Sequence, residues 1–288
     1  MQGVFPAIIT PFKDGKVDFE GLKNNIDFLI ENGVSGIVPM GTTGESPTLT
    51  YTEHNQVIEK AVEFADGRVK VIAGTGSNST AEALEFSEHA EDVGADGILL
   101  ISPYYNKPTQ EGLKRHFGAI AEATNIPMVL YNVPSRTALN IEPETVKYLY
   151  DEYDTVQAVK EANPSMSQVS EIKDLCDINI LSGNDELTLP IMALGGSGVI
   201  SVVANIVPKE FVEMVELAQA GKFAEAQKIH YELFPLMKSM FLETNPIPIK
   251  TAMNLMGKPS GELRLPLTEM AESNKEILKK SLNDLKLI

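Results

Sequence analysis

The sequence predicts a (β/α)8 barrel with a C-terminal helical extension, and three observations support it. Eight short apolar runs are rich in Val, Ile and Leu and lack polar alternation, as in parallel strands that are buried on both faces. Longer amphipathic segments alternate with these runs. A glycine motif recurs between a helix end and the next strand, at residues 33–37, 94–98 and 195–199. Eight strand–helix pairs in series favour a closed barrel, usually about 250 residues long, over a doubly wound open sheet.

Each expected element follows from these patterns in chain order. We expect strands at residues 4–9, 36–39, 70–73, 97–101, 128–131, 156–159, 178–182 and 198–202. We expect helices at residues 18–32, 52–65, 79–93, 109–124, 142–152, 165–176, 185–194 and 208–220. Hydroxyl residues with early acidic neighbours mark the starts of the second, third and fourth helices, at Thr52, Ser79 and Thr109.

Only helical patterns follow residue 221. They cover residues 222–242, 247–256 and 268–286 and are broken by prolines, Pro235 and Pro246 among them. We therefore expect two parts, a catalytic barrel over residues 1–221 and a three-helix region over residues 222–288.

Composition narrows the class of protein. The net charge of −16 argues against nucleic acid and anionic membranes as partners, because both attract basic surfaces. An anionic substrate would need a local basic group. The single cysteine, Cys176, excludes an intrachain disulfide and fits a reducing compartment, so we expect a cytoplasmic protein. No N-terminal pattern indicates a signal peptide, and no apolar run approaches the ~18 residues of a membrane span.

Several polar motifs follow the expected strands directly. GTTGES at 41–46 follows the second strand, SPYYNKPT at 102–109 the fourth, YNVPSRT at 131–137 spans the end of the fifth, and LSGND at 181–185 spans the end of the seventh. Lys160 ends the sixth strand. In a barrel the carboxyl ends of all strands meet at one mouth, where active sites form. A buried amine is costly to keep charged and so becomes a nucleophile, whereas the plain alternative is a lysine that reaches water.

Other residues at this mouth fit the chemistry of an anionic carbonyl substrate. Thr42 and Thr43 lie in a glycine-flanked turn whose N–H groups and hydroxyls can hold a carboxylate. Arg136 can grip a carboxylate bidentately, and Tyr131 and Tyr105 can relay protons. Each also has an ordinary alternative: a simple turn, a solvated arginine or a packed aromatic ring. The four histidines lack metal-ligand spacing, so we expect neither a catalytic metal nor a cofactor.

Taken together, the order and spacing of these motifs resemble the pyruvate-dependent class I aldolase superfamily, and most closely its dihydrodipicolinate synthase family. The resemblance covers nearly the whole chain. It also includes GVFPAIITPF at 3–12, GTGSN at 74–78, GVISV at 198–202, NPIPIK at 245–250 and LRLP at 263–266.

The resemblance implies an activity and roles for residues. Lys160 would form a Schiff base with pyruvate, whose enamine attacks the aldehyde of L-aspartate 4-semialdehyde, the first committed step of the diaminopimelate route to lysine. Tyr131 would move protons, and Thr43 would link it to Tyr105. That tyrosine comes from a neighbouring subunit in the family, so a homotetramer built as a dimer of dimers is implied.

The resemblance also assigns the substrate contacts. It implies that the pyruvate carboxylate is held by Thr42, Thr43 and Gly183, that Ile200 supplies a backbone contact beside the lysine, and that Arg136 receives the carboxylate of the semialdehyde. A regulatory site for L-lysine would use Ser46, His54, Asn78, Glu82 and Tyr104. However, Pro47 and Tyr51 replace the Ala and His that are often seen in lysine-inhibited members.

Two other functions stay open. N-Acetylneuraminate lyase and the keto-deoxy sugar acid aldolases share the lysine and the tyrosine but resemble YNVPSRT less well. A non-catalytic relative that senses a keto acid would be expected to lose the lysine, the tyrosine or the threonine, and this chain keeps all three.

Overall fold

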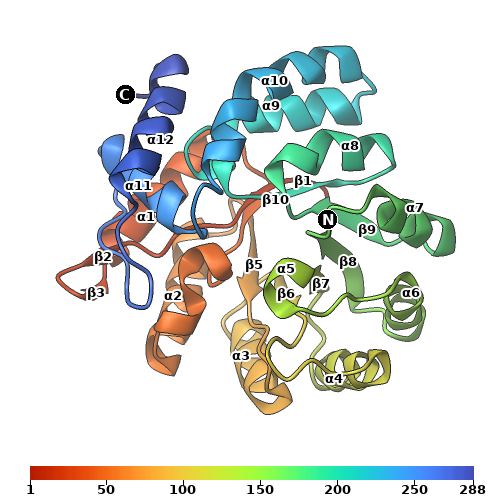
Figure 1. The fold of residues 1–288 in the computed structure, drawn as a ribbon. Coiled ribbons are helices and arrows are strands. Elements are labelled where there is room, and N and C mark those ends of the chain that lie inside the picture. The colour runs from red at the N-terminus through yellow and green to blue at the C-terminus, as the bar shows by residue number, and fades with distance from the viewer.

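The computed structural model describes residues 1–288 and confirms the predicted barrel. Eight parallel strands form it: β1 (Gly3–Pro6), β4 (Gly36–Ile37), β5 (Lys70–Gly74), β6 (Gly97–Ile101), β7 (Met128–Asn132), β8 (Val156–Glu161), β9 (Asn179–Ser182) and β10 (Gly198–Ser201). The strand β1 pairs with β10, and a parallel bridge between Ala7 and Val38 closes the remaining gap beside β4. The strands form the centre of Figure 1.

Eight helices surround the strands, as the alternating pattern predicted (Figure 1). They are α1 (Phe19–Glu31), α2 (Tyr51–Ala65), α3 (Thr80–Asp92), α4 (Gln110–Ala123), α6 (Pro143–Glu152), α7 (Met166–Leu175), α8 (Thr188–Ala193) and α9 (Pro208–Gln219). Ser79 and Thr109 cap α3 and α4 as expected. The cap of α2 is Thr50 rather than Thr52, because Thr50 forms a reciprocal capping box with Glu53.

The repeated glycine motif has the expected conformation. Gly33, Gly94 and Gly195 all adopt positive φ, at 82°, 83° and 94° respectively. A left-handed residue just past a helix end turns the chain toward the next strand, and glycine does so without a steric penalty. The repeated glycine motif therefore marks the same type of αβ loop at three places around the barrel.

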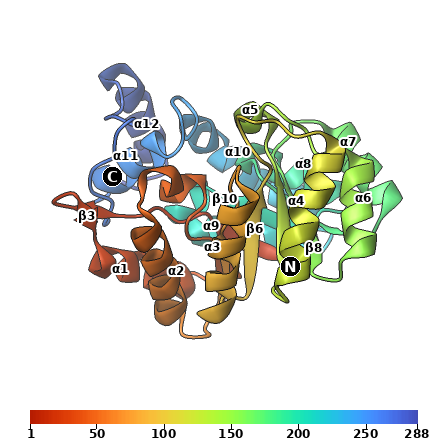
Figure 2. The same cartoon turned by 90° about the horizontal axis from the view of Figure 1, so that it is seen from below.

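Some short elements were not expected. The strands β2 (Phe12–Lys13) and β3 (Lys16–Val17) form an antiparallel hairpin, and α5 (Pro134–Thr137) forms a single helical turn after β7. Three-residue 3-10 helices follow β4, β9 and β10. Figure 2 shows α5 at one end of the barrel and the chain's N-terminus at the opposite end, so α5 marks the carboxyl end of the strands.

Three helices follow the barrel, as predicted: α10 (Phe223–Ser239), α11 (Ile247–Leu255) and α12 (Glu272–Asp284). The expected break at Pro235 is absent, since α10 continues through it. In both views α11 and α12 lie beside each other (Figures 1 and 2). One apolar core joins Val4 and Val199 of the barrel strands to Leu233, Met237 and Leu282 of these helices. No helix in the chain combines the length and the apolar character needed to cross a membrane.

Candidate active site

A cavity of about 310 Å³ lies at the carboxyl end of the barrel. Six of the predicted residues line it: Thr42, Thr43, Tyr131, Arg136, Lys160 and Gly183. These residues come from four different strand ends or the loops that follow them. Four of the five predicted motifs therefore meet at this cavity, whereas no residue of SPYYNKPT at 102–109 lines it. A larger cavity of about 520 Å³ lies between α11 and α12, and none of the predicted catalytic residues lines it.

Lys160 and Tyr131 face each other across two neighbouring strands. They are direct partners in the parallel register of β7 and β8. The Lys160 side chain is buried, with 6% of its residue surface exposed, and its Nζ lies 4.1 Å from the centroid of the Tyr131 ring. The amine thus points into the cavity over an aromatic face. This excludes the alternative that Lys160 simply reaches bulk water.

Gly183 lies close to the end of β8. Its N–H donates to the Glu161 carbonyl at 2.7 Å. A Cβ at this position would meet the Cβ of Ala162 at 2.6 Å, a distance that real side chains essentially never show. Glycine is therefore needed here for the backbone of one strand end to approach the next.

Thr43 is fixed by a residue that the sequence reasoning did not single out. Its Oγ1 accepts a hydrogen bond from Asn245 Nδ2 at 3.0 Å, and both residues are buried. Asn245 also accepts, through its backbone oxygen, a hydrogen bond from the Arg136 guanidinium at 3.3 Å. One residue from the segment between α10 and α11 thus contacts two predicted substrate-binding groups. The NPIPIK motif was the available signal, but it carried no assigned role.

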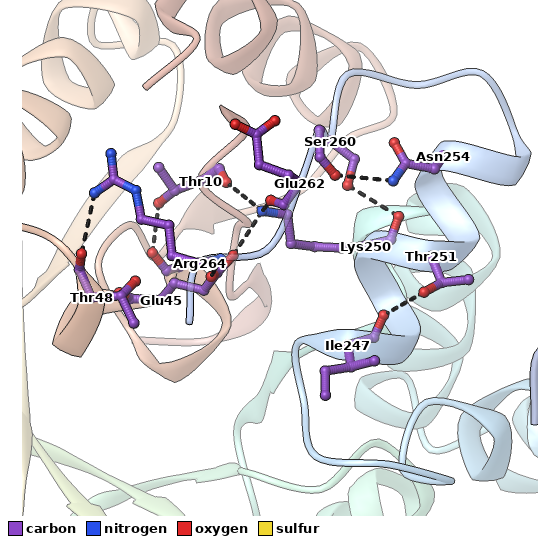
Figure 3. A network of polar contacts seen from close by, with 12 residues as sticks. Thr10, Glu45, Thr48, Ile247, Lys250, Thr251, Asn254, Ser260, Glu262 and Arg264 are labelled. Carbon is purple, nitrogen blue, oxygen red and sulfur yellow. Dashed lines mark hydrogen bonds and ion pairs between the residues drawn. The ribbon is translucent and has the colours of Figure 1, made fainter. Parts of the chain in front are cut away.

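A buried ion pair between Lys250 and Glu45 lies next to the loop that carries Thr42 and Thr43. Glu45, which follows this loop in a left-handed conformation, accepts a hydrogen bond from Lys250 Nζ at 2.7 Å. The Lys250 amine also donates to the backbone oxygens of Thr10 and Glu262. Figure 3 shows Lys250 reaching from α11 toward Thr10 and Glu45, with Arg264 lying over Glu45. Burial lowers the pKa of Lys250, against the opposing effect of Glu45.

Two more buried carboxyls flank the site. Burial raises the pKa of Glu161 to about 7, against the opposing effect of four hydrogen-bond donors. Burial also raises the pKa of Asp185, whose Oδ2 accepts from the N–H groups of Val202 and Val203. Neither carboxyl was assigned a role from the sequence.

Two predicted site residues do not line the cavity. Tyr105 has 91% of its surface exposed and a φ of 72°, so within one chain it points to solvent. Ile200 is buried in the barrel interior, where it pairs with Phe5 and packs in the same apolar cluster as Tyr131. The predicted relay from Tyr131 through Thr43 to Tyr105 stays a prediction, because the Thr43 hydroxyl bonds to Asn245 in the single chain.

The residues of the predicted lysine site lie around α2, α3 and the loop after β6. Glu82 accepts hydrogen bonds from Tyr51 and Ser77, and the His54 ring stacks on Phe86 at 4.0 Å. The Asn78 backbone oxygen accepts from the Asn106 amide at 2.8 Å. Ser46 and Tyr104 line a small adjoining cavity of about 80 Å³. Tyr51 therefore already donates a hydrogen bond to one oxygen of Glu82, the carboxylate that a basic ligand would bind.

Known proteins resemble this chain along its full length. The model of the dihydrodipicolinate synthetase family matches residues 1–285. Curated proteins named 4-hydroxy-tetrahydrodipicolinate synthase match it at 75% identity in Methanococcus maripaludis strain C7, over 100% of both chains, and at 69% in Methanocaldococcus jannaschii, over 100% of this chain and 99% of the relative. A crystal structure of a dihydrodipicolinate synthase superposes with a TM-score of 0.99 at 68% identity, covering 100% of both chains.

These likenesses span the whole barrel, the three helices that follow it and each motif that lines the cavity. The chain belongs to the dihydrodipicolinate synthetase family.

Proposed function

We propose that Lys160 is the residue that carries the reaction, by forming a Schiff base with pyruvate. The activity is that of a 4-hydroxy-tetrahydrodipicolinate synthase, a lyase of the Schiff-base aldolase type in lysine biosynthesis by the diaminopimelate route. The single observation that supports the role of Lys160 is its place, buried at the strand ends with its amine over the ring of Tyr131.

The proposed chemistry begins with an exchange of bonds at the keto carbon. The Lys160 amine adds to the pyruvate carbonyl, and loss of water leaves a C=N bond to the enzyme. A methyl proton then leaves, which gives an enamine. Tyr131, directly beside the amine, is suited to carry protons in both steps.

The enamine carbon next attacks the aldehyde of L-aspartate 4-semialdehyde, and a new C–C bond forms as the aldehyde oxygen takes a proton. The amino group of the former semialdehyde then attacks the imine carbon. This closes the ring and expels Lys160 as a free amine, so the enzyme returns to its starting state. Thr42, Thr43 and Gly183 are proposed to hold the pyruvate carboxylate at the cavity wall.

Arg136 supports the choice of aldehyde. It lies exposed at the rim of the cavity on a chain of net charge −16, with its guanidinium held by the Asn245 carbonyl. A cation in this position suits a substrate with a carboxylate better than a polyhydroxylated chain. The test is turnover of pyruvate with each aldehyde. We expect condensation with aspartate semialdehyde to be faster, and faster turnover of a sugar aldehyde would refute the assignment of Arg136.

We also propose a homotetramer in which Tyr105 completes the site of a neighbouring subunit. Its exposure supports this, because it leaves the ring free to contact a neighbouring subunit, and tyrosine is enriched at protein interfaces. Mixing Tyr105→Ala subunits with Lys160→Ala subunits tests it. If the tyrosine acts in the partner, mixed assemblies regain an intact site and part of the activity, whereas a tyrosine acting within its own chain gives no recovery.

L-Lysine is proposed as a regulatory ligand at Ser46, His54, Asn78, Glu82 and Tyr104. In this chain the ligand would compete with Tyr51 for Glu82. Titration calorimetry of wild type and Tyr51→His tests this, with tighter binding expected in the variant. Absence of heat from both proteins up to about millimolar lysine would exclude the site. The cytoplasmic location stays a prediction.

A further inference from the structure

A buried carboxyl lies directly behind the reactive lysine, on the opposite face of the same strand. Successive side chains of a strand point to opposite faces, so Lys160 points into the cavity and Glu161 points outward, toward α7. Glu161 is fully buried. The mechanism above does not use it.

The register of the two strands places a second pair behind the first. Tyr131 is the partner of Lys160 in the β7–β8 ladder, and Asn132 is the partner of Glu161. Asn132 Nδ2 lies 3.0 and 3.1 Å from the two carboxylate oxygens. The polar pair of Asn132 and Glu161 thus lies one residue beyond the pair of Tyr131 and Lys160, on the other face of the sheet.

The groups around the Glu161 carboxyl all donate hydrogen bonds to its oxygens. Besides Asn132, it receives the N–H of Asn163 at 2.7 Å and the Gln168 amide at 2.8 Å. Asn140 completes the network, since it donates to the Gln168 oxygen and accepts from Asn132 and Asn163. An amide at position 161 would place its own N–H₂ against at least one of these donors.

The same residues fix the backbone of the cavity wall. The Glu161 carbonyl accepts from the N–H of Gly183, and the Asn132 carbonyl accepts from the N–H of Ala162 at 2.9 Å. Ala162 and Gly183 both line the cavity. Glu161 and Asn132 therefore connect the polar network on one side of β8 to the strand ends that line the cavity on the other side.

We propose that Glu161 is a positioning residue for the Schiff-base chemistry: with Asn132 and Gln168 it fixes the end of β8 so that the Lys160 amine stays over the Tyr131 ring. This inference rests on the proposed role of Lys160. It assigns Glu161 an effect on the rate of imine formation and not on the affinity for substrate, because Glu161 does not touch the cavity.

The test compares Glu161→Gln, Asn132→Asp and the double variant with wild type. Each is mixed with pyruvate, reduced with borohydride at successive times and weighed, and kcat and KM are measured alongside. We expect Glu161→Gln to slow imine trapping and kcat about tenfold or more, with the KM for pyruvate changed by less than about threefold. The double variant, which exchanges carboxylate and amide across the pair, should recover at least about threefold of that loss.

Glu171→Gln is the matched control, because Glu171 is an exposed glutamate on the same helix as Gln168. It should behave as wild type. An unaffected trapping rate in Glu161→Gln, or a double variant no faster than both single variants, would overturn the positioning role. Failure of the wild type itself to trap pyruvate would instead refute the role of Lys160, so the two failures are distinguishable. Circular dichroism identifies a variant that fails to fold. Glu161→Asp, which keeps the carboxyl group on a shorter side chain, then replaces Glu161→Gln in the comparison and should slow trapping with an unchanged KM.

Discussion

The Lys160 amine lies 4.1 Å above the ring of Tyr131, and the two residues are partners in adjacent parallel strands. Their separation is set by the sheet and not by flexible loops, because both belong to strand interiors or ends that are buried. The proposed nucleophile and the proposed proton carrier are held by the same ladder, so they need no loop closure to meet.

Removal of the Tyr131 hydroxyl should slow catalysis without changing the fold. Tyr131→Phe keeps the ring beneath the amine, so packing is retained, but it removes the group that can carry protons. We expect kcat to fall by about 10²-fold or more, a typical contribution of general acid–base catalysis. Tyr148→Phe, at an exposed tyrosine on α6, is the control and should retain full activity. A Tyr131→Phe enzyme with wild-type kcat would show that protons travel by another route.

Asn245 should control how the hydroxyl of Thr43 is directed. Because the Asn245 amide donates to Thr43 Oγ1, the hydroxyl proton is free to point elsewhere, into the cavity. Asn245→Asp replaces this donor with an acceptor and adds a negative charge beside an anionic substrate. We expect the kcat/KM for pyruvate to fall by about tenfold or more, since a hydrogen bond is lost and a charge repulsion is gained. Asn254→Asp on α11 is the control, and equal losses in both variants would argue against this role.

The buried pair of Lys250 and Glu45 should be needed for stability. Only 1% of the Lys250 side chain is exposed, and none of the Glu45 side chain. Lys250→Met leaves a buried carboxylate without its cation, which costs ~3–5 kcal/mol of unfolding free energy. Denaturant unfolding measures this loss, and Glu45→Gln combined with Lys250→Met should restore part of it. A loss below about 1 kcal/mol in the single variant would mean that Glu45 finds another partner.

Acid should destabilise the chain through His116. Burial lowers the pKa of His116 from its usual 6.5 to about 4, and its Nε2 is buried without a hydrogen-bond partner. Between these pH values the unfolded chain binds more protons at His116 than the folded chain does. The contribution of neutral His116 to the free energy of unfolding is therefore fully present above pH 6.5 and is lost as the pH falls toward 4.

Wild type should therefore lose ~2 kcal/mol more than His116→Gln between about pH 8 and pH 5. Unfolding by denaturant at each pH measures the difference. His54 has a similarly lowered pKa of about 4 and remains in both proteins, so it cancels in the comparison. Equal losses in the two proteins would show that His116 can be protonated in the folded state at little cost.

The sequence predicted those parts of the site that depend on local pattern. Lys160 could be placed because an apolar run of five or six residues identifies a buried strand, and the barrel then dictates which end carries the chemistry. Thr42, Tyr131 and Gly183 follow from the same rule. The hairpin of β2 and β3 could not be predicted, because two-residue strands show no periodicity.

The contacts from the C-terminal region lay outside the reach of local pattern for a different reason. Asn245 is 202 residues from Thr43, and Lys250 is 205 residues from Glu45. No spacing rule connects such positions, and Lys250 lies in an apolar segment that reads as an ordinary helix. The outward-facing Glu161 was likewise read as the end of a strand, since its partners Asn132 and Gln168 come from two other elements.

The role of Lys160 is tested most sharply by borohydride reduction of the enzyme in the presence of pyruvate, followed by mass measurement of the peptide that contains Lys160. We expect one added three-carbon unit on that lysine in wild type, and none in Lys160→Ala. A wild-type peptide of unchanged mass, or the adduct on another lysine such as Lys250, would show that Lys160 does not carry the reaction.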